Sequence, residues 1–158
     1  LGAGRATRGI VPALLDAGPA GLTIANRTPA RALALVADLG APAALAGIGF
    51  DELDEARFDL VINATSAGLH GAGTPFPTSI VGPGTVCYDL SYAMDDTPFV
   101  DWARAAGAKA ACQGWGMLVE QAAESFRIWR GVRPDTGPVL ARLPGPGRSA
   151  EAGRRTAP

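Results

Sequence analysis

The sequence predicts an α/β fold with a doubly wound parallel sheet, in which helices cover both faces of the sheet. Short apolar segments alternate along the chain with segments of helical period, and this alternation is typical of successive βα units. The 158 residues are 47% hydrophobic and 6% aromatic, which suits one domain with an Ala/Val/Leu-rich core.

The first half of the chain contains two predicted βα units. A glycine turn at residues 2–4 leads into a helix that ends at Gly18, and its apolar positions share one face. Residues 21–25 (GLTIA) are a short apolar strand. Thr28 followed by Pro29 then predicts an N-cap with proline at the first helical position of a helix that ends at Gly40. The apolar positions of the two helices are Ile10, Val11, Leu14 and Leu15, and Leu33, Leu35, Val36 and Leu39.

The second half continues the alternation after a connection without a clear pattern. FDLVINAT is a continuous apolar run typical of a parallel strand buried on both faces, and the loop SAGLHGAGTPFP follows it. TVCYDLSY is a second such strand, TPFVDWARAAG is a helix bounded by Thr-Pro and Gly, and AKAACQ is a weak final strand. A last helix in GMLVEQAAESFRIWRG ends at Gly131, with Met117, Ala122, Phe126 and Trp129 at helical spacing.

The domain is expected to span residues 1–143. Residues 144–158 have too little apolar surface to offset chain entropy and are expected to be disordered. The chain starts without Met, and almost nothing precedes the glycine turn that should follow a strand. We therefore expect a truncated first strand and a longer parent chain.

Composition and charge exclude several function classes. Lys and Arg total 14 against 15 for Asp and Glu, so no long-range field attracts nucleic acid or an anionic membrane. No apolar run approaches the roughly 20 residues of a membrane span and no signal-peptide pattern opens the chain, so a cytoplasmic protein is expected. Cys87 and Cys112 are expected to be buried reduced thiols without a metal, and His70 a solvated loop side chain.

The glycine turn is the start of a dinucleotide fingerprint. In Gly2-Ala3-Gly4 the missing Cβ atoms would let the backbone approach a pyrophosphate at a helix N-terminus. Thr7 stands where the third glycine of the strict spacing belongs, so an ordinary tight turn remains an alternative at this point.

The residues after the second strand indicate which dinucleotide is bound. NAD-binding folds place an acid there to accept bonds from the ribose hydroxyls, whereas this chain has Asn26-Arg27-Thr28. Arg27 can pair with a 2'-phosphate and stack on adenine, and Arg31 lies in a first helical turn, where a cation is tolerable beside a bound phosphate. NADP is the predicted cofactor, and two solvated surface arginines are the alternative.

Four segments together carry a family resemblance. By NRTPAR, NATSAG, CYDLSY and GWGMLVEQAAESFRIWRG, the chain resembles the C-terminal NADP-binding domain of shikimate dehydrogenase. The resemblance implies a Rossmann-type fold and the NADPH-dependent reduction of 3-dehydroshikimate to shikimate in aromatic amino-acid biosynthesis. Tyr92 and Gln121 match the family's substrate-binding positions. The implied cofactor-binding residues are Gly2, Ala3, Gly4, Arg5, Ala6, Asn26, Arg27, Thr28, Arg31, Asn63, Thr65, Ser66, Leu90 and Gly114.

Two departures from the family pattern affect the cofactor site. Arg5 stands where the family usually has a further glycine, and it could supply a cation to the pyrophosphate or crowd it. Trp115 replaces a small or aliphatic residue between Gly114 and Gly116, which bears on the fit of the nicotinamide.

The resemblance places the catalytic Lys and Asp in an N-terminal substrate domain, and Lys109 matches neither. We assign no catalytic residue to this chain and expect it to be inactive alone. The face that would meet the other domain is apolar, so dimerisation through it is expected. Two alternatives are a glutamyl-tRNA reductase-like NADPH domain, which can also carry NRT, and a non-catalytic NADP-binding module.

Overall fold

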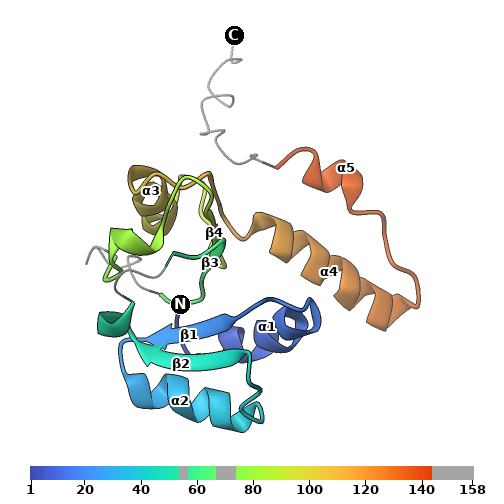
Figure 1. Ribbon diagram of the computed structural model, residues 1–158. Coiled ribbons are helices and arrows are strands. Elements are labelled where there is room, and N and C mark those ends of the chain that lie inside the picture. Colours follow the sequence, from blue (N-terminus) through green and yellow to red (C-terminus); the bar gives the residue numbers. More distant parts are fainter. Residues whose placement is uncertain (54–56, 67–73, 144–158) are drawn as a thin grey trace.

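The computed structural model describes residues 1–53, 57–66 and 74–143 (Figure 1). Within these residues, every paired strand runs parallel to its neighbour, and helices connect the strands. This arrangement confirms the α/β class. One sheet pairs β1 (Leu22–Asn26) with β2 (Leu45–Gly49), and the other has the order β3 (Leu60–Asn63), β4 (Val86–Asp89), β5 (Ala110–Cys112).

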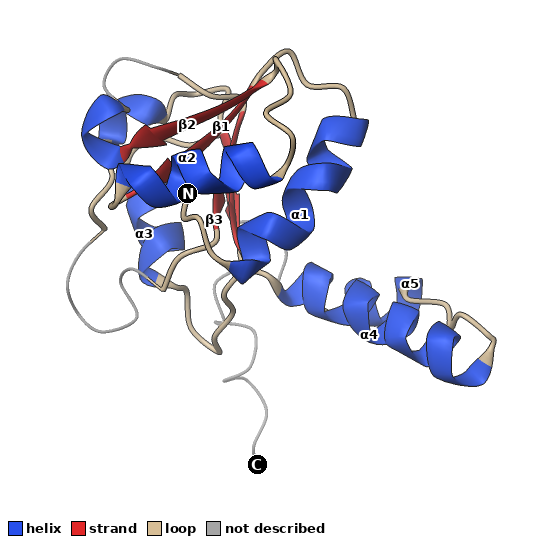
Figure 2. Cartoon of the chain, turned by 90° about the horizontal axis from the view of Figure 1, so that it is seen from below, coloured by secondary structure: helices blue, strands red, loops and turns tan. Residues whose placement is uncertain are grey.

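The helices begin and end close to the predicted residues. Two of them start with Thr-Pro, as expected, and α4 ends at Gly131, which has a left-handed φ of 74°. Both views show α4 extending away from the sheets, with the short α5 beside it (Figure 1, Figure 2). The helices are α1 (Arg5–Asp16), α2 (Pro29–Asp38), α3 (Pro98–Ala105), α4 (Trp115–Arg130) and α5 (Gly137–Leu140), with 3-10 turns at Phe50–Glu52 and Thr78–Ile80.

Two hydrophobic clusters hold the elements together. The first joins α1 and α2 to β1 and β2 through Val11, Ile24, Ala32, Leu35 and Leu45. The second lies around β3 to β5 and α3, and Phe76 is central to it. The Phe76 ring makes edge contacts with Phe50 and Trp102 at centroid distances of 5.0 and 5.8 Å, the geometry that aromatic quadrupoles favour.

Strand β2 was not expected, since residues 41–57 read as a connection. Its sequence LAGIG is poor in β-branched and aromatic residues, which are the usual signal of a strand. A Cβ atom on Gly47 would lie only 2.9 Å from the carbonyl carbon of Ala32, so α2 packs directly on the strand backbone. Gly47 therefore weakens the strand signal in the sequence, and the same glycine is required for α2 to pack on β2.

Helical spacing predicted α4 correctly but not which of its side chains are buried. Ala123 is buried, whereas Ala122, Phe126 and Trp129 are exposed, Trp129 to 78%. Leu33 on α2 is likewise exposed. Dimerisation through the face that would meet the other domain stays a prediction, and sedimentation velocity would test it.

Residues 1 and 2 connect the two sheets. The Leu1 amino group donates to the Ile62 carbonyl at 2.6 Å, and the Ala64 N–H donates to the Leu1 carbonyl at 2.9 Å. On the other side, the Gly2 N–H donates to the Ala25 carbonyl at 2.7 Å. The start of the chain thus lies between β1 and β3.

A polypeptide that begins at Leu1 should lose stability as the pH falls from 8 to 5. Burial lowers the pKa of its α-amino group from 8.0 to about 5, so in this window the unfolded chain takes up a proton that the folded chain does not. Each pKa unit corresponds to about 1.4 kcal/mol, and because the two groups are half protonated at the ends of this window the loss should reach roughly 3 kcal/mol. Urea unfolding at several pH values measures it. An N-acetylated chain is the control, and an equal pH dependence in both chains would contradict the assignment.

The cysteine prediction is confirmed in part. Both cysteines are free, Cys87 is fully buried and Cys112 is partly buried. Burial, and then the neighbouring Cys112, raise the pKa of the Cys87 thiol to about 11, which keeps it protonated and unreactive. His70 and residues 144–158 lie outside the described residues. Among the described helices, none has both the length and the apolar character that crossing a membrane requires.

Candidate functional site

The glycine turn at the start of the chain packs directly against the end of β3. Gly2 has a φ of +95°, and a Cβ atom there would lie 2.8 Å from Thr65 Cγ2 and 3.1 Å from the Ala64 carbonyl oxygen. Only glycine fits both the backbone conformation and the space. Thr7, at the place of the third fingerprint glycine, donates from Oγ1 to the Gly2 carbonyl at 2.9 Å and so closes the turn from inside.

Within the described residues, no side chain caps the first turn of α1, so its N–H groups can bind an anion. Its N-cap is Gly4, which has no side chain to accept from these N–H groups. Arg5 and Ala6 follow at the helix start, and Arg5 is exposed. The helix N-terminus therefore combines unsatisfied donors, the positive end of the helix dipole and a guanidinium.

The end of β1 presents two exposed guanidinium groups. Arg27 and Arg31 make no side-chain hydrogen bond or ion pair with another described residue, and the sequence has no acid between Asp16 and Asp38. The Asn26 amide donates to the Thr28 carbonyl at 2.9 Å, which turns the chain into α2.

Thr28 behaves differently from the other Thr-Pro cap. The Thr97 hydroxyl accepts from the Val100 N–H at 3.4 Å, whereas the Thr28 side chain makes no capping bond. Its hydroxyl and the first N–H groups of α2 can therefore donate hydrogen bonds to a phosphate, together with the two arginines. The bond from Gly2 to Ala25 keeps this cluster beside the glycine turn.

A cavity of about 440 Å³ brings five of the predicted residues together. It lies between the start of α1, the ends of β3 and β4, and the first half of α4. The predicted residues in its wall are Arg5, Ala6, Thr65, Leu90 and Gln121. Ser91 and Met117 also line it, and the sequence reasoning did not single them out. Asn26 to Arg31, Ser66, Tyr92 and Gly114 are outside its wall.

A buried polar cluster fixes the ends of β3 and β4. Asn63 is 1% exposed, and its Nδ2 donates to Asp89 Oδ1 at 3.0 Å, while its Oδ1 accepts from the N–H and hydroxyl of Thr65 at 3.1 and 2.6 Å. The side chain of Asn63 thus holds Thr65 at the cavity wall, and direct contact of Asn63 with a cofactor stays a prediction.

Asp89 is the acceptor at the centre of this cluster. Besides the Asn63 amide, its carboxylate accepts from the Ser91 N–H at 3.0 Å and from the Thr97 hydroxyl at 2.6 Å. It is 1% exposed and links β3, the loop after β4 and the start of α3. The sequence signal was present, since an acid ending a buried strand needs internal donors.

Gly114 fixes the start of α4 to the loop after β4. A Cβ atom there would lie 2.5 Å from the Leu90 carbonyl oxygen, and the Gly114 N–H donates to the Ser91 carbonyl at 2.9 Å. The structure therefore gives Gly114 a role against the Leu90 backbone. The expected approach of a cofactor ring to Gly114 stays a prediction.

Tyr92 and Trp115 form an aromatic pair between the loop after β4 and the start of α4. Their ring centroids are 4.7 Å apart with an interplanar angle of 44°, and Tyr92 is exposed to 44%. The unusual Trp115 thus packs on the tyrosine that the resemblance assigns to the substrate. The following loop is held by Gln113, whose Oε1 accepts from the Ala93 N–H at 2.7 Å and whose Nε2 donates to the Asp95 carbonyl at 2.9 Å.

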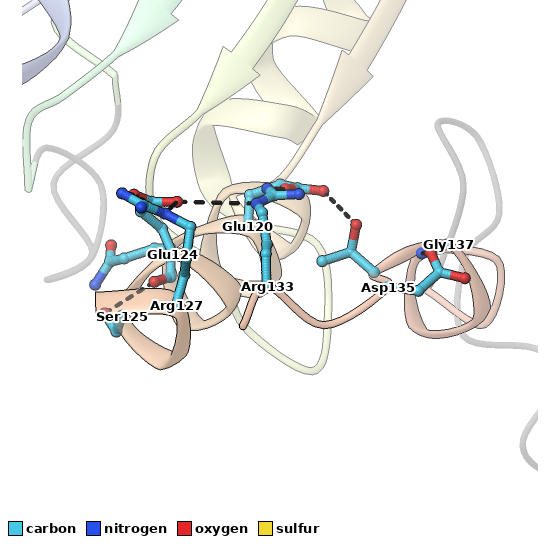
Figure 3. Close-up of polar contacts among 9 residues, drawn as sticks. Glu120, Glu124, Ser125, Arg127, Arg133, Asp135 and Gly137 are labelled. Atoms are coloured by element: carbon cyan, nitrogen blue, oxygen red, sulfur yellow. Dashed lines mark hydrogen bonds and ion pairs between the residues drawn. The ribbon is translucent and has the colours of Figure 1, made fainter. Parts of the chain in front are cut away.

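The segment after α4 folds back onto the helix turn that carries Gln121. Arg133 forms an ion pair with Glu120 and lies 3.8 Å from a Glu124 oxygen, and the Thr136 hydroxyl donates to Glu120 at 2.8 Å (Figure 3). The hydrogen bond from Thr136, and then that from Arg133, lower the pKa of the Glu120 carboxyl. These contacts hold the return segment along the exposed helix.

Comparison with known proteins points to one family. Residues 1–70 match the family described as shikimate/quinate 5-dehydrogenase, and residues 114–143 match the shikimate 5'-dehydrogenase C-terminal domain. The shikimate dehydrogenase (NADP(+)) of Alkalilimnicola ehrlichii is 56% identical over 143 residues, which are 90% of this chain and 53% of that protein.

Solved structures agree with this relationship. An Ael1 enzyme from Pseudomonas putida superposes with a TM-score of 0.82 at 45% identity, over 90% of this chain and 52% of that one. Shikimate 5-dehydrogenase from Thermus thermophilus, in complex with NADP(H) and shikimate, has a TM-score of 0.69 at 37% identity, over 85% and 49% of the two chains. The chain thus spans about half the length of the relatives it matches.

Proposed function

Because the chain belongs to the shikimate dehydrogenase family and has a Rossmann-type α/β fold, we propose that it is the NADP-binding part of such an enzyme. The activity of that enzyme is the NADPH-dependent reduction of 3-dehydroshikimate to shikimate. When bound, the cofactor supplies the hydride for the ketone carbon. The family matches favour this assignment over the glutamyl-tRNA reductase-like alternative.

The observation that carries the proposal is the pair of guanidinium groups at the end of β1, which make no hydrogen bond or ion pair with the side chain of another described residue. Arg27 and Arg31 are exposed next to Thr28, whose side chain makes no capping bond at the start of α2. A carboxylate at this place would favour the ribose hydroxyls of NAD, whereas two guanidiniums favour the 2'-phosphate of NADP.

We assign the other predicted site residues to the diphosphate, the nicotinamide and the substrate, in that order along the edge of the sheet. The uncapped start of α1, with Arg5, suits the diphosphate. The cavity walled by Thr65, Leu90 and Gln121 follows it and suits the nicotinamide and the substrate. Gln121 in the cavity wall has an amide that can both donate to and accept from ring hydroxyls. We assign the substrate a further hydrogen bond from the exposed Tyr92, the neighbour of Ser91. We assign Ser66, exposed after Thr65, to the ribose and diphosphate.

Among the described residues that line the cavity, none could protonate the alkoxide formed on the substrate. Arg5 is the one ionisable residue in its described wall, and a guanidinium keeps its proton at any ordinary pH. We therefore propose that this chain binds cofactor without turning substrate over. The two free thiols suit a reducing compartment such as the cytoplasm.

Calorimetric titration of the chain with NADP and with NAD tests the proposal. One charge-assisted phosphate contact should favour NADP by at least about 1 kcal/mol, which is fivefold or more in affinity. A parallel assay with shikimate and NADP should show no turnover. Equal affinities would refute the 2'-phosphate site, and turnover would refute the absence of a proton-transfer group.

A further inference from the structure

Ser91 lines the cavity but has no role in the proposed function. It follows Leu90 in the loop after β4, and it shares the wall of the cavity of about 440 Å³ with Met117 and Gln121 of α4. Its side chain is short and half-buried, so the backbone of the loop determines where its hydroxyl lies. What Ser91 can bind therefore depends on how this loop is held and on what its hydroxyl contacts.

The backbone of Ser91 is held from two sides. Its N–H donates to Asp89 Oδ1 at 3.0 Å, and its carbonyl accepts from the Gly114 N–H at 2.9 Å. The preceding Leu90 N–H donates to the Asn63 carbonyl at 2.9 Å. Asp89 and Asn63 are each 1% exposed and are bonded to each other, so the loop is fixed to β3, β4 and the start of α4. A group placed by such a loop is preorganised for binding.

The hydroxyl of Ser91 makes no hydrogen bond with another described residue, although both backbone groups of Ser91 do. Within the described part of the chain, every fully buried side-chain nitrogen and oxygen of the buried and half-buried residues has a hydrogen-bond partner. The Ser91 oxygen has none, so it must be accessible. It can therefore donate one hydrogen bond to a bound molecule and accept others from it.

The wall around Ser91 is suited to a flat ring with one polar substituent. Leu90, Met117 and Ile10 contribute apolar side chains from the loop after β4, α4 and α1. Apolar walls cover ring faces, whereas a polar substituent on the ring needs a hydrogen-bonding group beside it. The nicotinamide ring has such a substituent, a carboxamide with an acceptor oxygen and a donor NH₂ group. A hydroxyl can bond to either atom.

The nicotinamide is also the part of the cofactor that would reach this wall. Arg5, which we assign to the diphosphate, lines the same cavity as Ser91. The nicotinamide riboside follows the diphosphate in the cofactor, so it is the part that enters the cavity. This step rests on the proposed function.

We propose that the Ser91 hydroxyl binds the carboxamide of the nicotinamide and so fixes the orientation of the ring in the cavity. A hydrogen bond to the carboxamide restricts rotation of the ring about its bond to the ribose, so that one face of the ring is presented to the substrate. Ser91 is thus a cofactor-binding residue that orients the reacting ring, and it is not the proton donor of the reaction.

Two ligands and two variants test this role by calorimetry. The ligands are NADP and 2'-phospho-ADP-ribose, which keeps the 2'-phosphate, the diphosphate and both riboses but has no nicotinamide. Ser91→Ala removes the hydroxyl and leaves both backbone bonds of residue 91 in place. Ser79→Ala is the matched control, since it makes the same change at an exposed serine of the 3-10 turn Thr78–Ile80, outside the cavity wall.

Ser91→Ala should weaken the binding of NADP roughly three- to tenfold, the usual effect of one lost neutral hydrogen bond. Its affinity for 2'-phospho-ADP-ribose should not change, and Ser79→Ala should change neither affinity. An equal loss for both ligands, as expected of a structural role or of a ribose contact, would overturn the assignment, and so would an unchanged affinity for NADP. If the unaltered chain bound neither ligand, the proposed function itself would be wrong, and this inference with it.

Discussion

Replacing Arg27 by Asp should reduce the affinity for NADP roughly ten- to hundredfold and remove the preference over NAD. The change deletes a guanidinium that can pair with the 2'-phosphate and puts a carboxylate in its place, which repels the same group. Charge-assisted hydrogen bonds contribute about 1.5–3 kcal/mol each, which sets this range. Arg27 is exposed and makes no side-chain contact with another described residue, so the thermal midpoint should not move.

Arg142→Asp is the matched control for this experiment. It makes the same charge change on an exposed residue of the C-terminal segment, far along the chain from β1. Calorimetry should show little loss of NADP affinity for this variant. If both variants lost affinity equally, the effect would be one of net charge and the 2'-phosphate contact at Arg27 would be wrong.

Replacing Asp89 by Ala should destabilise the chain by about 3–5 kcal/mol. The buried carboxylate accepts from the Asn63 amide, the Ser91 N–H and the Thr97 hydroxyl, and its removal leaves these buried donors without an acceptor. Since a domain is typically stable by about 5–15 kcal/mol, this loss is a large part of the total. The urea midpoint measures it.

Two further variants show whether the loss of stability comes from the hydrogen bonds of Asp89 or from the removal of a negative charge. Asp89→Asn keeps an oxygen for Asn63 and Ser91, and Thr97 can reverse its hydroxyl to accept, so a smaller loss of about 1–2 kcal/mol is expected. Asp101→Ala, an exposed acid in the first turn of α3, should cost only a few tenths. An Asp89→Ala variant as stable as the Asp101→Ala variant would show that the cluster does not hold the strand ends.

The sequence predicted the elements whose signals are local. Thr-Pro marks the start of α2 and α3, and glycine marks the end of α4, because caps and proline act within a few residues. The apolar runs predicted β1, β3 and β4. Strand β2 was not predicted, because its glycines are required by the close packing of α2, and that contact comes from another part of the chain. Which side chains of α4 are buried was not predicted, because helical spacing indicates an apolar face but not whether another element covers that face.

The candidate site was predictable to a similar extent. Residues that end parallel strands meet at one edge of the sheet. Thr65 and Leu90 accordingly line one cavity, and Gly2 packs against Thr65, while the binding roles of these residues stay predictions. The central role of Asp89 was not predicted, because it depends on a donor from the preceding strand, Asn63, and on the position of Thr97 at the start of α3, as well as on the nearby Ser91 N–H. Trp115 was recognised as unusual, but only the structure shows its contact with Tyr92.

A crystal structure of the chain with NADP tests the central claim most directly. We expect the 2'-phosphate within hydrogen-bonding distance of the Arg27 or Arg31 guanidinium, about 2.7–3.2 Å, and the diphosphate against the turn at residues 2–6. A complex in which the adenosine end lay away from Asn26 to Arg31 would contradict the account.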